Sequence, residues 1–362
     1  MEYYARDKDV NSADGAVIKA LMADMTRSDK HLKQFHDLID NAEALDISEI
    51  NVRQAVLESK KQEVRLALAA AIAEGKQHKD LLDEYVELVE MTELGEFGKQ
   101  EMEVVNRHSL AAILTEEQDD STKMAVYPRI ISEHIGGGLR GGHHVVVYGM
   151  SESGKTALVL TIAAGFARQG FTGLYFGNED RSEDMMMRLL SCLTGLTKAQ
   201  ILADPTEAIQ AAVDVGLDNI QFIKVAPGTP RQIADAVEKH KPKWIVIDQL
   251  RNLAMKSDNR VVQLEAAATA ARNLAKKYNI VVISVTQAGE SARDKAILDS
   301  GDVDFSNVGI PAQADLMIGI GLNAGLEGRG ERMISLPKNK LSGDHSAFPV
   351  KLNAFISRYT ST

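Results

Sequence analysis

The sequence predicts an α/β protein in which a mainly parallel, twisted sheet carries helices on both faces and is preceded by a small all-helical N-terminal domain. Two observations predict this. From Val126 onward, short continuous apolar runs alternate with helical patterns, as in βα units whose strands are buried on both faces. Before that point, residues 12–94 show helical periodicity with no strand pattern between the segments. A chain of 362 residues has room for one large domain and a smaller unit.

The N-terminal part contains three helical patterns. The first runs from the capping residues Ser12 to Asp14 to a break near Asn41, the second from about Ser48 to Gly75, and the third from Lys79 to Leu94. Their apolar stripes call for a small bundle or for partner chains. We therefore expect a helical assembly or docking domain over 1–94, a linker over 95–125 and the α/β domain over 126–362.

The net charge of −10 lies entirely in the N-terminal part. Residues 1–105 hold 13 Lys and Arg against 23 Asp and Glu, and the rest of the chain holds 28 of each sign. This balance excludes a broad basic face that coats duplex DNA, so any nucleic-acid contact is expected in a few loops. The acidic N-terminal part fits a protein-docking module or a solvated helical surface, and the composition does not decide between them.

Cysteine content and hydropathy indicate the compartment. The single cysteine, Cys192, excludes an internal disulfide framework and a multi-cysteine metal site. The sequence has no run of 18 apolar residues, and its N-terminus is too charged for a signal peptide. We expect a soluble cytoplasmic protein without a membrane segment, in a bacterial or phage-infected cell.

Eight strands are predicted after Val126, and helices follow most of the first five. Two helix starts are well marked, because Asp204-Pro205 and Thr229-Pro230 each place a capping residue before a proline at the first helical position. The predicted strands are 144–148, 173–177, 219–224, 243–248, 280–286, 315–320, 331–337 and 348–356.

The stretch VVVYGMSESGKT, residues 145–156, is the strongest motif of the chain. It is a P-loop of the form G-x-x-x-x-G-K-[ST], set between a predicted strand and a predicted helix. Its backbone N–H groups can surround a phosphate at a helix N-terminus, Lys155 can neutralise the outer phosphates, and Thr156 can complete a Mg²⁺ shell. The motif predicts ATP and Mg²⁺ as ligands. The expected nucleotide contacts are Gly149, Ser151, Glu152, Ser153, Gly154, Lys155, Thr156 and Ala157.

Two acidic positions follow predicted strands. Asp248 ends the apolar run Trp244 to Ile247, at the strand edge where α/β sheets bind ligands, and it can hold the Mg²⁺ water shell or simply cap the strand. Glu179, after the strand that ends near Gly177, can orient and polarise the water that attacks ATP. Asp180 competes for that role, and both carboxylates could instead stabilise the helix that starts near Ser182.

A further strand, VVISVTQ, ends in Gln287. Its amide can hydrogen-bond a γ-phosphate and so couple the nucleotide state to the loop 288–309, which is long enough to suggest a function. Basic residues follow this strand and the Asp248 strand. They are either solvated surface or DNA contacts gathered by a ring of several chains. The candidate DNA-binding residues are Arg251, Lys256, Arg260, Arg293 and Lys295.

Taken together, the motifs resemble a known family. The stretches IGGGLRGGHHVVVYGMSESGKTALVL, YFGNEDRSEDMMMRLLSCLTGL, WIVIDQL, VISVTQ and QADLMIGI look like the RecA-like ATPase domain of DnaB-type hexameric replicative helicases, over roughly Ile130 to Arg358. That family forms a six-membered ring around single-stranded DNA and moves 5′ to 3′. The resemblance implies that Lys155 and Thr156 bind Mg-ATP, Glu179 activates water, Asp248 supports the metal and Gln287 senses the γ-phosphate. It also implies a primase or a helicase loader as a partner.

The segment PKNKLSG, residues 337–343, departs from the family pattern. These helicases generally show a lysine, one spacer and an arginine that reaches into the neighbour's ATP site, and here Lys340 stands in place of the arginine. The K-N-K spacing resembles the lysine pair of RecA recombinases instead. Lys338 is the alternative finger, and a solvated basic turn is the alternative to both. The N-terminal residues match no known collar domain residue by residue, so primase docking is open.

The leading hypothesis is an ATP-driven helicase that translocates on single-stranded DNA as a hexamer. Two alternatives remain, a RecA-like strand-exchange ATPase that forms filaments, and a nucleotide-switched loader that binds DNA without unwinding it. A small-molecule P-loop kinase fits less well, because the chain shows no obvious lid segment.

Overall fold

The computed structural model divides the chain into two compact units, residues 1–105 and 106–362. Each unit is considered by itself. Within them, the residues whose structure is described below are 52–75, 78–96, 110, 114–115, 119–177, 181–224, 228–255, 259–304 and 309–362.

The first unit contains a pair of packed helices, α4 (Val52–Ala73) and α5 (Lys79–Glu96). They match the second and third helical patterns of the sequence. Val64 and Leu68 of α4 and Leu88 of α5 are buried, and Gly75 lies in the left-handed region with φ 65°, where glycine is favoured after a helix end. The helical pattern predicted for 12–41 lies outside the described residues.

The second unit is built on a nine-stranded sheet of order β3-β2-β4-β5-β1-β6-β7-β8-β9. Strands β1 to β6 are parallel, and β7, β8 and β9 continue the sheet as antiparallel strands. The strands are β1 (His144–Gly149), β2 (Gly173–Gly177), β3 (Ile220–Lys224), β4 (Trp244–Asp248), β5 (Val281–Gln287), β6 (Leu316–Gly321), β7 (Glu331–Asn339), β8 (Ala347–Asn353) and β9 (Arg358–Ser361).

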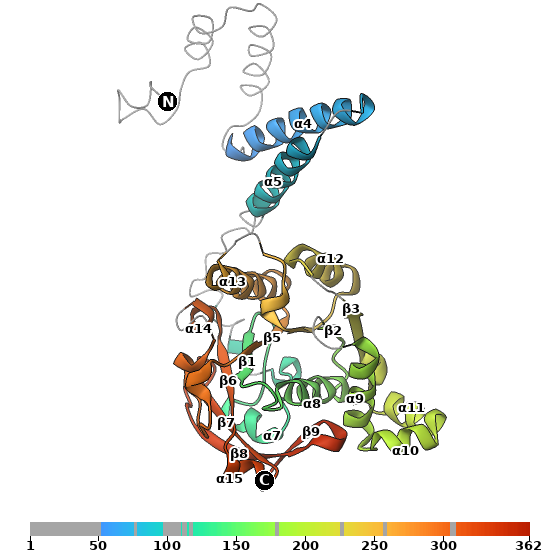
Figure 1. The fold of residues 1–362 in the computed structure, drawn as a ribbon, viewed down its shortest axis with the longest axis vertical. Coiled ribbons are helices and arrows are strands. Elements are labelled where there is room, and N and C mark those ends of the chain that lie inside the picture. Colours follow the sequence, from blue (N-terminus) through green and yellow to red (C-terminus); the bar gives the residue numbers. More distant parts are fainter. Residues whose placement is uncertain are drawn as a thin grey trace, which may run out of the picture. The chain divides into compact units, whose positions relative to one another are not determined.

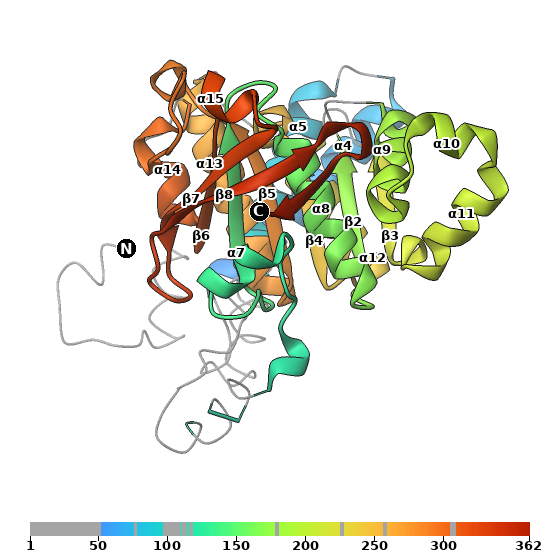
Figure 2. The same ribbon diagram turned by 90° about the horizontal axis from the view of Figure 1, so that it is seen from below.

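Helices cover both faces of this sheet, with α12 and α13 on one side and α8 and α9 on the other (Figure 1). Helices α10 and α11 lie at the β3 end, and α14 and α15 at the end formed by β7 (Figure 2). The helices are α7 (Arg129–His134), α8 (Lys155–Arg168), α9 (Ser182–Thr194), α10 (Lys198–Ala203), α11 (Pro205–Asp214), α12 (Pro230–His240), α13 (Arg260–Tyr278), α14 (Gly309–Gln313) and α15 (Ala324–Glu327).

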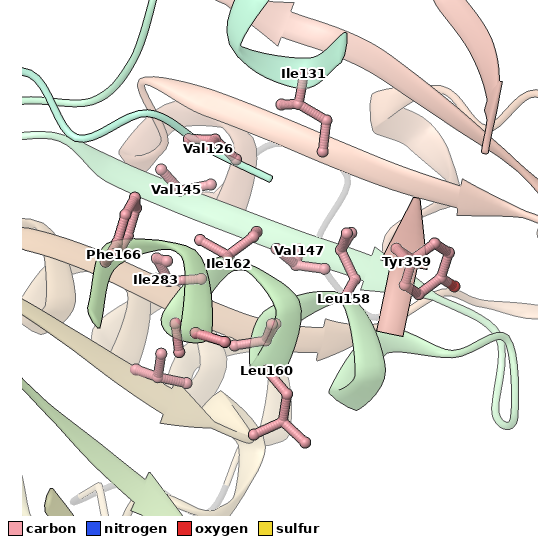
Figure 3. Close-up of a cluster of buried hydrophobic side chains, with 14 of the residues drawn as sticks. Val126, Ile131, Val145, Val147, Leu158, Leu160, Ile162, Phe166, Ile283 and Tyr359 are labelled. Carbon is pink, nitrogen blue, oxygen red and sulfur yellow. The ribbon is translucent and has the colours of Figure 1, made fainter. Parts of the chain in front are cut away.

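The continuous apolar strands supply both faces at once. In β1, Val145 and Val147 point to the core under α8, whereas Val146 and Tyr148 point to the core under α13. Figure 3 shows the first of these cores, where Leu158 and Ile162 of α8 meet the strands. The mainly parallel, two-sided α/β fold predicted from the sequence is thereby confirmed.

The predicted strands agree with the structure within two residues, with one exception. Residues 348–356 do not form one strand, because β8 ends at Asn353 and the chain returns as β9. The Asn353 side chain accepts a hydrogen bond from Phe355 N at 3.1 Å, and Ser357 adopts a left-handed φ of 47°. These two residues reverse the chain, a turn that the apolar pattern did not indicate.

Both marked helix starts are capped as predicted. Asp204 accepts from Glu207 N at 3.0 Å, and Thr229 forms a capping box with Gln232. At the front of the second unit, Ala125 exchanges hydrogen bonds of 2.8 and 2.9 Å with the Gln169 side chain. Residues at the end of the predicted linker are thus bonded to the α/β domain, and the domain limits 94 and 126 stay predictions. None of the described helices is long and apolar enough to cross a membrane.

Candidate active site

The parallel strands bring the predicted motifs to one edge of the sheet. In the strand register Gly149, the last residue of β1, is level with Gln287 of β5, and Gly177 of β2 is level with Asp248 of β4. Carboxyl ends of parallel strands therefore converge around the segment that follows β1. Segments that lie far apart in the chain meet here.

The loop between β1 and α8 has the backbone of a phosphate-binding turn. Glu152 and Gly154 adopt left-handed φ values of 62° and 100° before α8 begins at Lys155. A Cβ on Gly149 would lie 2.6 Å from Ser153 Oγ, and one on Gly154 would lie 2.4 Å from the Tyr359 hydroxyl. The two glycines of the motif are thus required by close packing, and the loop ends at a helix N-terminus that attracts anions.

Lys155 is held by the loop itself. Its side chain is 6% exposed, and Nζ donates hydrogen bonds to the carbonyl oxygens of Gly149 at 3.1 Å and Met150 at 2.8 Å. An ammonium fixed in this way needs no search among rotamers to meet a phosphate. The motif predicts this role for Lys155, and its position at the loop agrees with it.

Beside the loop lies a cavity of about 420 Å³, a size suited to a nucleotide. The predicted contacts Ser151, Glu152, Gly154, Lys155, Thr156 and Ala157 line it, as does Gln287. Ser153 is fully buried and Gly149 lies beneath the loop, so these two support it from behind. Residues that no motif indicated also line the cavity, namely Arg188, Gln249, Arg332, Leu352, Ala354 and Ser357.

Asp248 sits at the tip of β4 with only 5% of its surface exposed. Tyr175 of the neighbouring strand β2 donates its hydroxyl to Asp248 Oδ2 at 2.6 Å and fixes the carboxylate. The following residue, Gln249, is the one that reaches the cavity wall. Among the described residues no cluster of three or more acidic, His or Cys side chains could hold a metal alone. Thr156 and Asp248 therefore fit a Mg²⁺ that takes its other ligands from phosphates and water.

The two candidates for the catalytic carboxylate, Glu179 and Asp180, lie outside the described residues. The strand β2 ends two residues before Glu179, beside the tip of β4. Sequence position alone assigns the role to Glu179, which stays a prediction.

The predicted DNA-binding residues occupy different environments. Arg293 is exposed and paired with Glu290 at 2.9 Å, and Lys295 lies 2.8 Å from the buried Asp302. These carboxylates raise the pKa of both cations. Arg251 is half-buried in a short turn after β4, Arg260 is exposed at the start of α13, and Lys256 lies outside the described residues. The loop after Gln287 is thus internally ion-paired, and its role in DNA binding stays a prediction.

Lys338 and Lys340 lie at the opposite edge of the sheet from the phosphate loop. Asn339 between them is level with Leu316 of β6, which is level with Val145 near the start of β1. At about 3.3 Å per residue the two ends of β1 are about 17 Å apart. Neither lysine lines the cavity described above.

A P-loop, a buried strand-end aspartate and a cavity at the carboxyl edge of a mainly parallel sheet define a P-loop ATPase domain with a RecA-like fold. A family model described as an AAA domain matches residues 114–293. No curated protein sequence matches the chain significantly.

Among solved structures, the fold is that of DnaB-like replicative helicases, as the sequence motifs suggested. The isolated ATPase domain of one such helicase is similar with a TM-score of 0.62 at 14% identity, covering 72% of this chain and 99% of that one. A DnaB-like replicative helicase, described with its interactions with primase, has a TM-score of 0.61 at 16% identity, covering 98% and 89%. At these identities the likeness establishes the fold.

Proposed function

We propose that the protein is an ATP-dependent replicative DNA helicase that works as a hexameric ring on single-stranded DNA. The observation that supports it most is the separation of Lys338 and Lys340 from the phosphate loop of their own chain. A RecA-like domain with its nucleotide cavity at one sheet edge and a pair of lysines at the other is suited to head-to-tail assembly, in which each lysine pair meets the next chain's cavity.

The residues of the site take the roles that this reaction requires. Lys155 and the loop N–H groups bind the β- and γ-phosphates, and Glu179 orients and polarises the attacking water. Gln287 hydrogen-bonds the γ-phosphate and passes its loss to the loop 288–309. Thr156 and Asp248 would hold Mg²⁺, which supplies neutralisation of the phosphate charge when bound. Lys340 of the neighbouring chain adds charge to the transition state.

The loops after Asp248 and Gln287 are proposed to contact the DNA backbone. Phosphate contacts carry no sequence information, so binding should be independent of sequence and sensitive to salt. A primase or a loader is proposed as a partner of the acidic N-terminal unit, since one of the similar structures is described with primase.

Electron microscopy of the full chain with an ATP analogue and single-stranded DNA tests the assembly. We expect closed hexamers, together with ATPase activity that single-stranded DNA stimulates and ATP-dependent unwinding of a forked duplex. Helical filaments with strand exchange would indicate a recombinase, which the K-N-K spacing resembles. DNA binding without rings, filaments or unwinding would indicate a loader.

A further inference from the structure

Arg332 of β7 is a cation in the cavity wall that no motif announced. Its side chain is 8% exposed and lines the same cavity as Lys155 and Thr156. The Nε–H donates to the carbonyl oxygen of Ser153 at 3.0 Å, and Nη1 donates to the carbonyl oxygen of Glu331 at 2.8 Å. Two backbone carbonyls therefore fix the guanidinium against the phosphate loop.

The charge of Arg332 has no balancing carboxylate in the described part of the chain. The adjacent acid, Glu331, is paired instead with Arg329, whose Nε lies 2.8 Å from it. A guanidinium has five N–H donors and no acceptor, and the two carbonyls use two of these donors. Burying a cation without an anion is costly, and a negatively charged ligand in the cavity offsets that cost. The environment of Arg332 is thus suited to an anion.

The strand order indicates which part of a nucleotide Arg332 meets. Gln287 and Asp248 end β5 and β4, on one side of β1, and by their proposed roles they mark the γ-phosphate and the metal. Arg332 lies on β7, on the other side of β1, just beyond the pair formed by Gly321 and Met333. A nucleotide that spans the loop therefore has its inner part, the α-phosphate and the ribose, beside Arg332.

The same side of the cavity is completed by the C-terminal hairpin. Leu352, Ala354 and Ser357 line it with uncharged groups, and the Tyr359 hydroxyl donates to the Ser153 carbonyl at 3.3 Å, the atom that Arg332 also holds. Arg332 is thus the charged group of a wall that is otherwise uncharged, as an anchor for an inner phosphate would be.

We infer that Arg332 is a nucleotide-binding residue that contacts the α-phosphate, the group that ATP, ADP and AMP share. It also keeps the phosphate loop in place through Ser153. The inference rests on the proposed nucleotide site and adds to it a residue that acts on substrate and product alike.

Affinities of the full chain for ATP and ADP, measured by calorimetry, test this. Arg332→Gln should weaken both by a similar factor, between about tenfold and a hundredfold, the range of a charge-assisted hydrogen bond. Arg332→Lys should recover part of that affinity, because it restores the charge without the planar fork. Arg329→Gln, an exposed neighbour on the same segment, should bind like the wild type.

Three outcomes would overturn the inference. The first is an Arg332→Gln protein with both affinities within about twofold of the wild type. The second is weaker binding of ATP but not of ADP, which would place Arg332 at the γ-phosphate. The third needs no variant and applies even if Arg332→Gln fails to fold, namely wild-type protein that binds AMP no more tightly than adenosine. Wild-type protein that binds no nucleotide at all would instead overturn the proposed function, and this inference with it.

Discussion

The Lys340 ammonium lies 3.4 Å from the Asp315 carboxylate, at the sheet edge opposite the phosphate loop. Arg272 shares this carboxylate at 3.3 Å, and the backbone N–H of His144 donates to it at 3.1 Å. Although burial raises the pKa of Asp315, these partners hold it below its ordinary value. Asp315 would therefore keep two partners if Lys340 turned to another anion. This makes Lys340, 48% exposed, the more available of the two lysines.

Lys338 is less available for a reaction between chains. Its side chain is half-buried, and Nζ donates to the carbonyl oxygen of Pro311. Burial, followed by the nearby charge of Lys340, lowers its pKa. The structure thus gives the two candidate fingers different surroundings, whereas the sequence showed only two lysines with one spacer.

Replacing Lys155 by alanine should abolish ATP hydrolysis. The ammonium is the side-chain charge fixed within the phosphate loop, and removal of such a group lowers turnover by about a hundredfold or more. Steady-state ATPase of the full chain measures this, with Lys198→Ala, an exposed lysine of α10, as the control. Wild-type turnover in Lys155→Ala would contradict the assignment of the loop.

Glu179→Gln should retain nucleotide binding and ring formation but lose turnover. The amide can still hydrogen-bond a water molecule but polarises it poorly. Single-turnover hydrolysis combined with nucleotide affinity separates the two effects. If Asp180→Asn gives this behaviour while Glu179→Gln stays active, the catalytic carboxylate is the neighbouring residue.

The double variant Arg293→Ala, Lys295→Ala should bind single-stranded DNA with a weaker dependence on salt. Each phosphate that is no longer neutralised by the protein lowers the slope of log affinity against log salt by about 0.7. The control replaces the exposed Lys198 and Lys239, which lie on helices away from this loop. An unchanged slope would mean that the ion pairs with Glu290 and Asp302 keep this loop from the DNA.

Acid should destabilise the second unit through His144. The ring is fully buried, with Nδ1 2.9 Å from the Gln313 carbonyl oxygen and Nε2 2.9 Å from Ser284 Oγ, and burial lowers its pKa to about 4 from an ordinary value of 6.5. The unfolded state therefore binds the proton first, so stability falls as the pH drops from about 6.5 towards 4, by about 2 kcal/mol at pH 5.

Denaturant midpoints between pH 7 and 5 measure this effect. Carboxylates also titrate in acid, so the quantity to compare is the difference between the wild type and His144→Gln, whose side chain has no proton to take up in this range. An identical pH dependence in both proteins would show that His144 does not control acid stability.

Local patterns in the sequence predicted the elements whose information lies close together in the chain. The strands around Val145 and Ile245, the capped helices at Asp204 and Thr229, and the phosphate loop all follow from apolar runs, caps and glycines. Strand alternation then brought Asp248 and Gln287 to one edge as a consequence of parallel topology.

What could not be predicted depends on contacts between distant segments. Arg332 reaches Ser153 across 179 positions, and Tyr359 reaches it across 206. The Tyr359 contact depends on the reversal at Asn353 and Ser357, where the apolar pattern predicted a continuous strand. Without that hairpin, the wall beside the phosphate loop had no visible origin in the sequence.

Mixing two inactive variants should restore ATPase activity if Lys340 acts on the neighbouring chain. Lys340→Ala should be inactive because its charge reaches only another chain's γ-phosphate, and Glu179→Gln because it cannot activate water. Mixed rings contain interfaces with an intact Glu179 from one chain and an intact Lys340 from the next, so part of the activity should return. Lysine offers a point charge without the fork of arginine, so we expect a working site with modest transition-state discrimination. Lys351→Ala, on the exposed strand β8, controls for loss of surface charge, and Lys338→Ala tests the alternative finger in the same mixture. Full activity of Lys340→Ala alone, or no activity in mixtures whose subunits exchange, would show that Lys340 has no role between chains.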